Sequence, residues 1–374
     1  MLLRRSRILP GLSLALAISL ASSHAFAQDD GDANEPLFQQ GQSQLDPGVP
    51  SLVPAVPAAA TRTILLNVVV APGPGGAPVP GLLQNDFVIR DNSVIQTIQS
   101  FHTFSGPGAP AEVVIVIDAV NAVYQRIPYE RQQVAAFLRD NGGKLAHPTA
   151  IAILTDAGVQ MQPKFSSDGN ALADFVEHVT IPLRSVGRSA GFYGASERFQ
   201  KSIRGLSTLN TRLAADPGRK LVLWISPGWP LLSGPRTQLG KRSQQNIFTT
   251  ILALSAQMRT ANVTLYSISP VFGGDTERIF YYQTFLKPVE KPEKSQVGNL
   301  ALQVLAAQSG GLVLNSSNDI AGYLRTAVAD SNMYYELSYD PQPVAHSVEY
   351  HSVDITLTRP GLNARARQGY YSQP

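Results

Sequence analysis

The sequence contains no cysteine among its 374 residues, and only 15% of its residues are charged. Without thiols the chain forms no disulfide, holds no thiolate metal site and has no attachment residue for a lipoprotein anchor. Beyond residue 27 no apolar stretch reaches the roughly 20 residues that cross a bilayer as a helix. We therefore expect no cysteine-based scaffold or metal centre, and no membrane span after removal of an N-terminal signal.

An excess of charge of one sign is also lacking. The chain has 30 basic and 27 acidic residues, but residues 1–27 contain Arg4, Arg5 and Arg7 and no acidic residue. Without that segment, 27 basic residues face 27 acidic ones, and the remainder is formally neutral. A neutral surface produces no field that attracts DNA, RNA or anionic lipid, so we predict no nucleic-acid partner.

Residues 1–27 are typical of a secretory signal peptide. The three arginines precede a mostly apolar run from Ile8 to Leu20, and Ala25-Phe26-Ala27 is a small-x-small cleavage site. The alternative is an uncleaved membrane anchor, for which the apolar run is short. We expect an exported protein that is periplasmic or extracellular.

The next segment, residues 28–60, is rich in Gln, Asp, Pro and Ala and shows neither the helical nor the strand period of apolar residues. Such a composition does not bury enough surface to fold, so we predict a disordered linker.

The flanks of the remaining chain, residues 61–106 and 333–372, favour β-structure. In the first flank we expect a strand over Thr63–Val70 and a hairpin formed by Asp86–Arg90 and Ile95–Phe101. Further strands are predicted over Tyr334–Tyr339, Tyr350–Thr358 and Ala364–Gly369. The simplest arrangement pairs both flanks into one small accessory β-sheet.

Residues 110–332 alternate strands with helices. Continuous apolar runs predict parallel strands that are buried on both faces, at Val113–Ile117, Ala150–Leu154, Leu221–Ile225 and Val263–Ile268. Helical spacing is found over Tyr129–Arg139, Leu172–Val179, Glu197–Leu213, Ile247–Met258, Leu300–Ala307 and Ile320–Ser331. This order predicts an α/β fold with a doubly wound, mostly parallel sheet and helices on both faces.

Several of these stretches resemble a known family. VVIVIDAVNAV, LVLWISPG and VTLYSISP, in this order, are similar to the strands of a von Willebrand factor A-like (vWA) domain. The flanking NVVV, VPGLLQNDFVIRDNSVIQTIQSF, LAAQSGG, YYELSYDP and RPGLNARARQGYY resemble the VWFA-related proteins that are abundant in acidobacterial genomes. The resemblance covers roughly residues 61–372. It implies a vWA/Rossmann-like fold, but the family has no established activity.

The resemblance also implies a metal site, which this sequence largely lacks. Metal-binding vWA domains use a D-x-S-x-S run, a later Thr and a second Asp, all hard oxygen ligands that suit Mg²⁺. Here Asp118 is present, but Val120 and Ala122 replace the two serines, Ala190 replaces the threonine and Pro227 replaces the second aspartate. We therefore predict a degenerate site with no metal and no other cofactor, although Asn121 and Ser189 offer substitute oxygens.

Asp118 allows two interpretations. It either accepts hydrogen bonds from nearby backbone N–H groups at the turn after its strand, together with Asn121, or the two residues bind a ligand directly. Aspartate and asparagine are turn formers, which favours the first interpretation.

No catalytic set is found. His346, Glu349 and His351 raise the possibility of zinc, but in a strand His346 faces away from the other two, and an exposed polar strand is the better interpretation. A G-x-S-x-G elbow is absent, and Ser226 is followed by Pro227, which lacks the N–H that an oxyanion hole uses. We predict that the protein is not an enzyme.

Two loops should emerge beside Asp118, Arg184–Ser196 and Ser226–Gln245. They are rich in aromatic and basic residues, the types that dominate protein-binding hot spots. The alternative is a pair of solvated loops with one aromatic residue in the core. The residues predicted to bind a ligand at this edge are Asp118, Asn121, Arg188, Tyr193, Ser226, Trp229 and Arg236.

These observations predict a non-catalytic protein–protein interaction module that binds protein partners in the periplasm or cell envelope without a metal or a small-molecule cofactor. The alternative is a metal-dependent hydrolase, or a metal-dependent adhesion protein, that uses Asp118.

Overall fold

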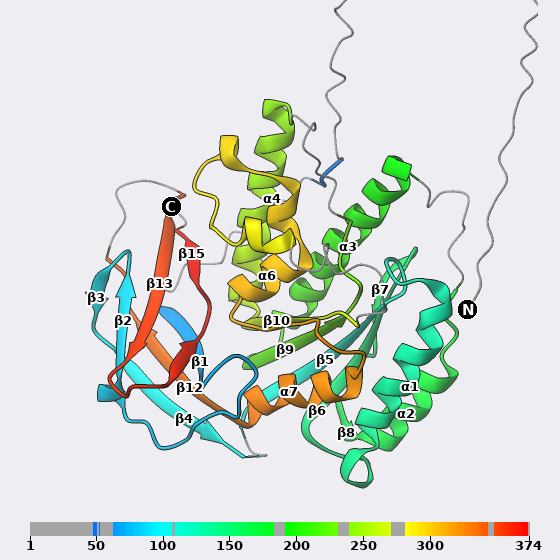
Figure 1. Cartoon of the computed structure of the whole chain (residues 1–374), viewed down its shortest axis with the longest axis horizontal. Coiled ribbons are helices and arrows are strands. Elements are labelled where there is room, and N and C mark those ends of the chain that lie inside the picture. The colour runs from blue at the N-terminus through cyan, green and yellow to red at the C-terminus, as the bar shows by residue number, and fades with distance from the viewer. Residues whose placement is uncertain are drawn as a thin grey trace, which may run out of the picture. The chain divides into compact units, whose positions relative to one another are not determined.

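A central, mostly parallel β-sheet organises the protein (Figure 1). The computed structural model describes residues 48–50, 52, 63–106, 109–182, 191–230, 239–270, 281–342 and 348–372. Within these ranges the sheet has seven strands in the order β11-β10-β9-β5-β6-β7, with β8 also paired to β6. The strands are β5 (Ala111–Asp118), β6 (Lys144–Thr155), β7 (Gly158–Met161), β8 (Ser166–Asp168), β9 (Arg219–Ile225), β10 (Val263–Ile268) and β11 (Val313–Leu314).

The five strands from β11 to β6 run parallel to their neighbours, whereas β7 and β8 lie antiparallel to β6. The parallel strands include the four predicted from apolar runs, and the bounds of β10 agree with the prediction at both ends. The mixed α/β fold with a mostly parallel sheet is therefore confirmed.

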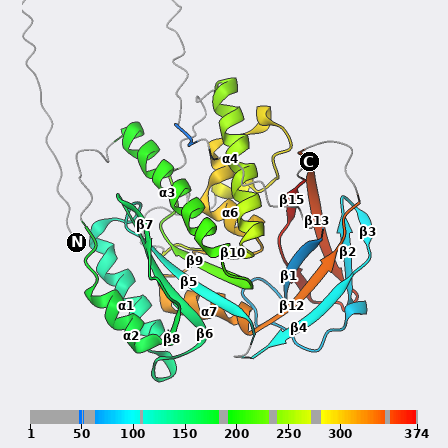
Figure 2. The same ribbon diagram turned by 180° about the vertical axis from the view of Figure 1, so that it is seen from behind.

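Helices cover both faces of this sheet (Figure 2). In β5, Ile115 and Ile117 share an apolar cluster with α1, α2 and α7, while Val114 and Val116 share another with α3, α4 and α6. A strand buried on both faces needs apolar residues at every position, which explains the continuous run. The helices are α1 (Ile127–Leu138), α2 (Gly169–His178), α3 (Gly191–Leu213), α4 (Lys241–Thr260), α6 (Leu302–Gln308) and α7 (Ile320–Asn332).

Side-chain caps fix the starts of two of these helices. Asp168 accepts a hydrogen bond from the backbone N–H of Ala171 at the start of α2, at 3.0 Å. Asp319 accepts one from the N–H of Gly322 at the start of α7, at 2.7 Å. Each cap satisfies a backbone donor that has no partner within its own helix. Short 3₁₀ turns lie at Gln84–Asp86, Tyr124–Arg126, Asp140–Gly143, Tyr281–Phe285, Pro292–Lys294 and Val297–Leu300.

The flanks form two antiparallel sheets, and the prediction of one accessory sheet is wrong. One sheet has the order β14-β1-β12-β4 and the other β15-β13-β2-β3. Their apolar faces pack against each other, since residues of both sheets belong to one buried cluster. The strands are β1 (Ile64–Ala71), β2 (Phe87–Asp91), β3 (Val94–Gln96), β4 (Ser100–Ser105), β12 (Met333–Tyr339), β13 (Tyr350–Leu357), β14 (Asn363–Arg365) and β15 (Gly369–Tyr371).

The error arose because two segments that were each predicted as one strand divide between the sheets. Residues 95–101 contribute to β3, which pairs with β2, and to β4, which pairs with β12. Residues 364–369 divide in the same way between β14 and β15. A single small sheet leaves one apolar face exposed, whereas two packed sheets bury both.

Part of the predicted linker is structured. Val49 is only 7% exposed and belongs to the apolar cluster of α3 and α4, and Leu52 packs against the same cluster. The prediction of disorder over residues 28–60 is therefore wrong for residues 48–50 and 52. Among the described residues, the structure contains no helix with the length and apolar character needed to span a membrane.

Candidate functional site

The central sheet has a point where the chain connections leave in opposite directions. From β5 the chain passes to β6 on one side, and the later strand β9 lies on the other side of β5. In open α/β sheets, ligands bind where the connections leave in opposite directions, outside the carboxyl ends of the strands. Asp118 ends β5 at this position, and Ser226 directly follows β9.

Asp118 is fully buried and its carboxylate accepts four hydrogen bonds. Oδ1 accepts from the backbone N–H groups of Val120 at 3.1 Å and Asn121 at 3.0 Å. Oδ2 accepts from the side-chain amide of Asn121 at 2.8 Å and the indole N–H of Trp224 at 3.1 Å. An ionised carboxylate has about four acceptor positions, so its capacity is used within the protein. The capping interpretation of Asp118 is confirmed.

Asn121 extends this network to the neighbouring helix. Its side-chain amide also donates to Ser202 Oγ on α3 at 2.8 Å, and Ser202 donates to the carbonyl of Arg198 at 2.9 Å. The Oδ1 atom of Asn121 is buried and finds no donor among the described residues. The loop after β5 is thereby held against α3.

Trp229 lies in the core, although we predicted it to bind a ligand at this edge. It is 4% exposed, and its ring meets that of Trp224 edge to face, with centroids 5.5 Å apart at 75°. Its indole N–H finds no acceptor in the described parts of the chain. Burial of two large aromatic surfaces against each other explains this position. The alternative prediction, in which one aromatic residue of the two loops lies in the core, fits Trp229.

Glu130, on α1, is a buried acid that we did not predict. It is 1% exposed, and burial, followed by the negative charge of Asp118, raises its pKa from 4.5 to about 8, against an opposing effect of Arg126. Its Oε2 atom finds no donor among the described residues. The signal in the sequence was its spacing, because Glu130 lies on the same helix face as the buried Ile127 and Val134.

The remaining predicted residues lie in different environments. Ser226 is buried, its Oγ accepts from the backbone N–H of Gly228 at 3.2 Å, and its own backbone N–H donates to Ile268 at 2.9 Å. Tyr193 lies in the first turn of α3 and is 86% exposed. Arg188 and Arg236 lie outside the described residues.

The residues around Asp118 that the structure describes do not fit a divalent cation. Mg²⁺ and Ca²⁺ need several oxygen ligands, whereas the acceptor positions of Asp118 are occupied and the neighbouring Val120 is apolar. The nearby Glu130 carboxyl has a pKa of about 8 and is mostly protonated at neutral pH. Across the described residues, no group of three or more His, Asp or Glu side chains is arranged to hold a metal ion.

Exposed residues lie in the segment after β5 and in the first turns of α3 and α4. Val123 is 51% exposed and Tyr124 is 54% exposed, and both follow Asp118 in the same loop. Tyr193 precedes Ser202 by nine residues in α3, which places it about 13 Å along the helix from the Asn121 contact. Lys241 and Arg242 are exposed in the first turn of α4. We call Val123, Tyr124, Tyr193, Lys241 and Arg242 the edge surface.

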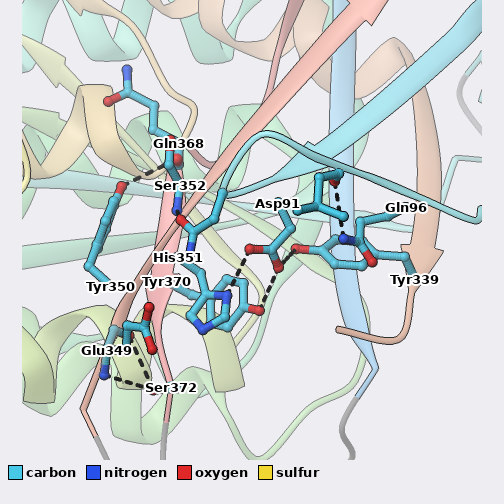
Figure 3. A network of polar contacts seen from close by, with 12 residues as sticks. Asp91, Gln96, Tyr339, Glu349, Tyr350, His351, Ser352, Gln368, Tyr370 and Ser372 are labelled. Carbon is cyan, nitrogen blue, oxygen red and sulfur yellow. Dashed lines mark hydrogen bonds and ion pairs between the residues drawn. The ribbon is translucent and has the colours of Figure 1, made fainter. Parts of the chain in front are cut away.

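A second buried aspartate lies between the flanking sheets (Figure 3). Asp91 Oδ1 is 2.7 Å from His351 Nδ1, and Oδ2 accepts from the hydroxyls of Tyr339 at 2.9 Å and Tyr370 at 2.8 Å. The rings of His351 and Tyr370 stack with centroids 4.8 Å apart. Burial raises the pKa of both tyrosines, and the Asp91 carboxylate raises it further.

The prediction that His351 lies on an exposed strand is therefore wrong. His351 is buried, whereas Glu349 is exposed, so the two do not converge on a zinc ion, and His346 lies outside the described residues. Sequence reasoning missed this cluster because its four members come from four separate strands.

Comparisons with known proteins assign no family. No family model matches this sequence, and no curated protein matches it. The structure is similar to a manganese-loaded TRAP protein of Plasmodium vivax, with 11% identity over 72% of this chain and 97% of that chain and a TM-score of 0.32. It is also similar to the pilus adhesin SpaC of Lactobacillus rhamnosus GG, with 12% identity over 79% of this chain and 43% of that chain and a TM-score of 0.36. Similarities at these values assign neither family nor function.

Proposed function

We propose that this chain is an exported, non-catalytic interaction module that binds a partner protein of the cell envelope through the edge surface, without a bridging metal ion. The observation that carries the proposal is the combination of a closed carboxylate and exposed aromatic residues at the ligand-binding edge of the fold. The four internal hydrogen bonds of Asp118 use the acceptor positions of its carboxylate. Tyr124, six residues after Asp118, and Tyr193, in the first turn of α3, instead present large side chains to solvent.

The charge at the start of α4 supports an acidic partner. Lys241 and Arg242 lie in the first turn, which contains no acidic residue. The positive end of the helix dipole disfavours each cation there by about 0.3–1 kcal/mol. Two exposed cations at such a position lower the stability of the free protein and are suited to carboxylates on a partner. The tyrosines supply the apolar contact area that protein interfaces use.

A capture experiment tests the edge surface. The full chain is immobilised and exposed to an envelope extract, and retained proteins are identified. We expect the variant Tyr193→Ala with Lys241→Glu and Arg242→Glu to lose at least tenfold of a partner that the wild-type chain retains. A matched variant with Lys144→Glu and Lys164→Glu, two exposed lysines away from this edge, should retain it. Equal retention of the partner by both variants would show that the edge surface does not bind it.

Metal independence is tested separately by calorimetric titration of the chain with Mg²⁺, Mn²⁺ and Ca²⁺. We expect no binding at micromolar affinity, and unchanged partner capture in EDTA. Micromolar binding that disappears in Asp118→Ala, or capture that EDTA abolishes, would instead support a metal-dependent protein that uses Asp118.

The proposal of export rests on the three arginines, the apolar run and the Ala25-Phe26-Ala27 site. Mass spectrometry of the protein from a secreting host should show Gln28 as the first residue. A mature chain that begins at Met1 would contradict cleavage.

A further inference from the structure

Residues 48–50 and 52 occupy the groove between α3 and α4. Val49 shares its buried cluster with Phe199 and Ile203 of α3 and with Phe248 and Ile251 of α4. Pro50 is also buried, and Leu52 packs against the same cluster. Both Val49 and Pro50 come from a stretch whose composition predicts no structure, so the groove supplies the apolar surface that orders them.

Gly48 shapes the entry of the chain into this groove. Its φ angle is +60°, which side-chain-bearing residues rarely adopt, and a Cβ atom added there would lie 2.5 Å from Gln200 Nε2 on α3. Glycine adopts this left-handed conformation without strain, so it suits the point where the backbone turns toward Val49.

A hydrogen bond between this segment and α4 is exchangeable. Thr250 is fully buried, and its hydroxyl lies 2.8 Å from the carbonyl oxygen of Pro50 and 2.9 Å from that of Asn246, four residues earlier in α4. If Pro50 leaves the groove, Thr250 still donates to Asn246, so its buried hydroxyl keeps an acceptor. The contact between Thr250 and Pro50 can thus be released and formed again without leaving this hydroxyl unpaired.

The sequence around the segment repeats the seated dipeptide. Val-Pro occurs at Val49-Pro50, Val53-Pro54 and Val56-Pro57, three times within nine residues. Proline favours an extended backbone and has no N–H, so its carbonyl is its only backbone hydrogen-bonding group. Valine supplies a compact apolar side chain. These are the features by which Val49-Pro50 fits between the two helices.

We propose that the site between α3 and α4, called here the α3–α4 groove, binds extended apolar Val-Pro segments. Residues 48–50 and 52 fill it in the free protein, and a partner's segment of the same chemistry fills it in a complex. The linker is then an intramolecular ligand that competes with the partner. This site shares none of its residues with the edge surface and goes beyond the proposed function.

A labelled peptide of residues 44–57 tests the groove in the full chain. Val49, Val53 and Val56 are changed to Asp to release the intramolecular ligand, and folding is checked by circular dichroism. We expect the peptide to bind this variant at least tenfold more tightly than it binds the wild-type chain, because the wild-type segment competes. A peptide that carries the same three changes should not bind. Equal affinity for both chains, or no binding to the released variant, would overturn the proposal.

The contact with α4 is tested by adding Thr250→Val to the released variant. Loss of one neutral hydrogen bond should weaken peptide binding about fivefold. If the released variant does not fold, hydrogen exchange of residues 48–57 in the wild-type chain is followed as peptide is added. Displacement should speed their exchange, and unchanged exchange at saturating peptide would contradict displacement. Light scattering should show that the wild-type chain is a monomer. A wild-type dimer that the three Asp changes dissociate would show instead that the segment in the groove comes from a second copy of the chain.

Discussion

Two of the buried aspartates, Asp118 and Asp91, are satisfied in opposite ways. Three of the four hydrogen bonds to Asp118 come from residues two or three positions further along the chain. The partners of Asp91 are His351, Tyr339 and Tyr370, which are at least 248 residues away in sequence. Asp118 therefore organises one loop, whereas Asp91 joins β2 to β12, β13 and β15. The comparison shows that similar burial of one residue type serves a local turn in one place and a tertiary connection in the other.

Removal of Asp91 should give the largest effect. Asp91→Ala leaves two tyrosine hydroxyls and the His351 ring without an acceptor between two packed sheets, where water does not replace it. We expect the free energy of unfolding to fall by about 4 kcal/mol. Urea denaturation followed by circular dichroism measures this change. A loss below about 1 kcal/mol would show that these donors find other acceptors.

A smaller effect on the free energy of unfolding is expected from Glu130, a second buried acid near Asp118. Its folded pKa of about 8 lies above the ordinary value of 4.5, so the native state holds a proton that the unfolded chain releases as the pH rises between these values. Stability is therefore lost across this window, at about 1.4 kcal/mol per pH unit from this group, or about 3 kcal/mol between pH 5 and 7.5.

Glu130→Gln should remove this slope. The measurement is urea denaturation of both proteins at several pH values from 5 to 8.5, with Glu290→Gln, an exposed glutamate, as the matched control. Parallel stability curves for Glu130→Gln and the wild-type chain would show that the Glu130 carboxyl is not held protonated beside Asp118.

The smallest effect is expected from Asp118 itself. Asp118→Ala removes an acceptor from Trp224 and from the turn, but Asn121 is only partly buried and its loop is near solvent. Water should replace part of the lost bonding, and we expect a loss of about 2 kcal/mol in urea denaturation. A loss equal to that of Asp91→Ala would remove the distinction between a local and a tertiary role.

Much of the central fold was predictable because its signals are local. Val263–Ile268 is a continuous apolar run, and such a run fits a strand buried on both faces. The turn after β5 was predictable for the same reason, since Asp118 and Asn121 are close in sequence and their hydrogen bonds follow from their residue types. The flanks were harder, because residues 95–101 contain strands of two sheets that differ in their partners and not in their composition.

Sequence alone determined the alternation of strands and helices and the absence of oxygen side chains at Val120, Ala122, Ala190 and Pro227. Tertiary structure alone decided that Trp229 is in the core, that His351 joins Asp91, that Glu130 lies near Asp118, and that Val49 and Pro50 lie between α3 and α4. The physical reason is the distance along the chain over which each property is determined. Backbone geometry and turn hydrogen bonds depend on neighbours within a few residues, whereas burial, pKa and pairing depend on groups that only the packed chain brings together.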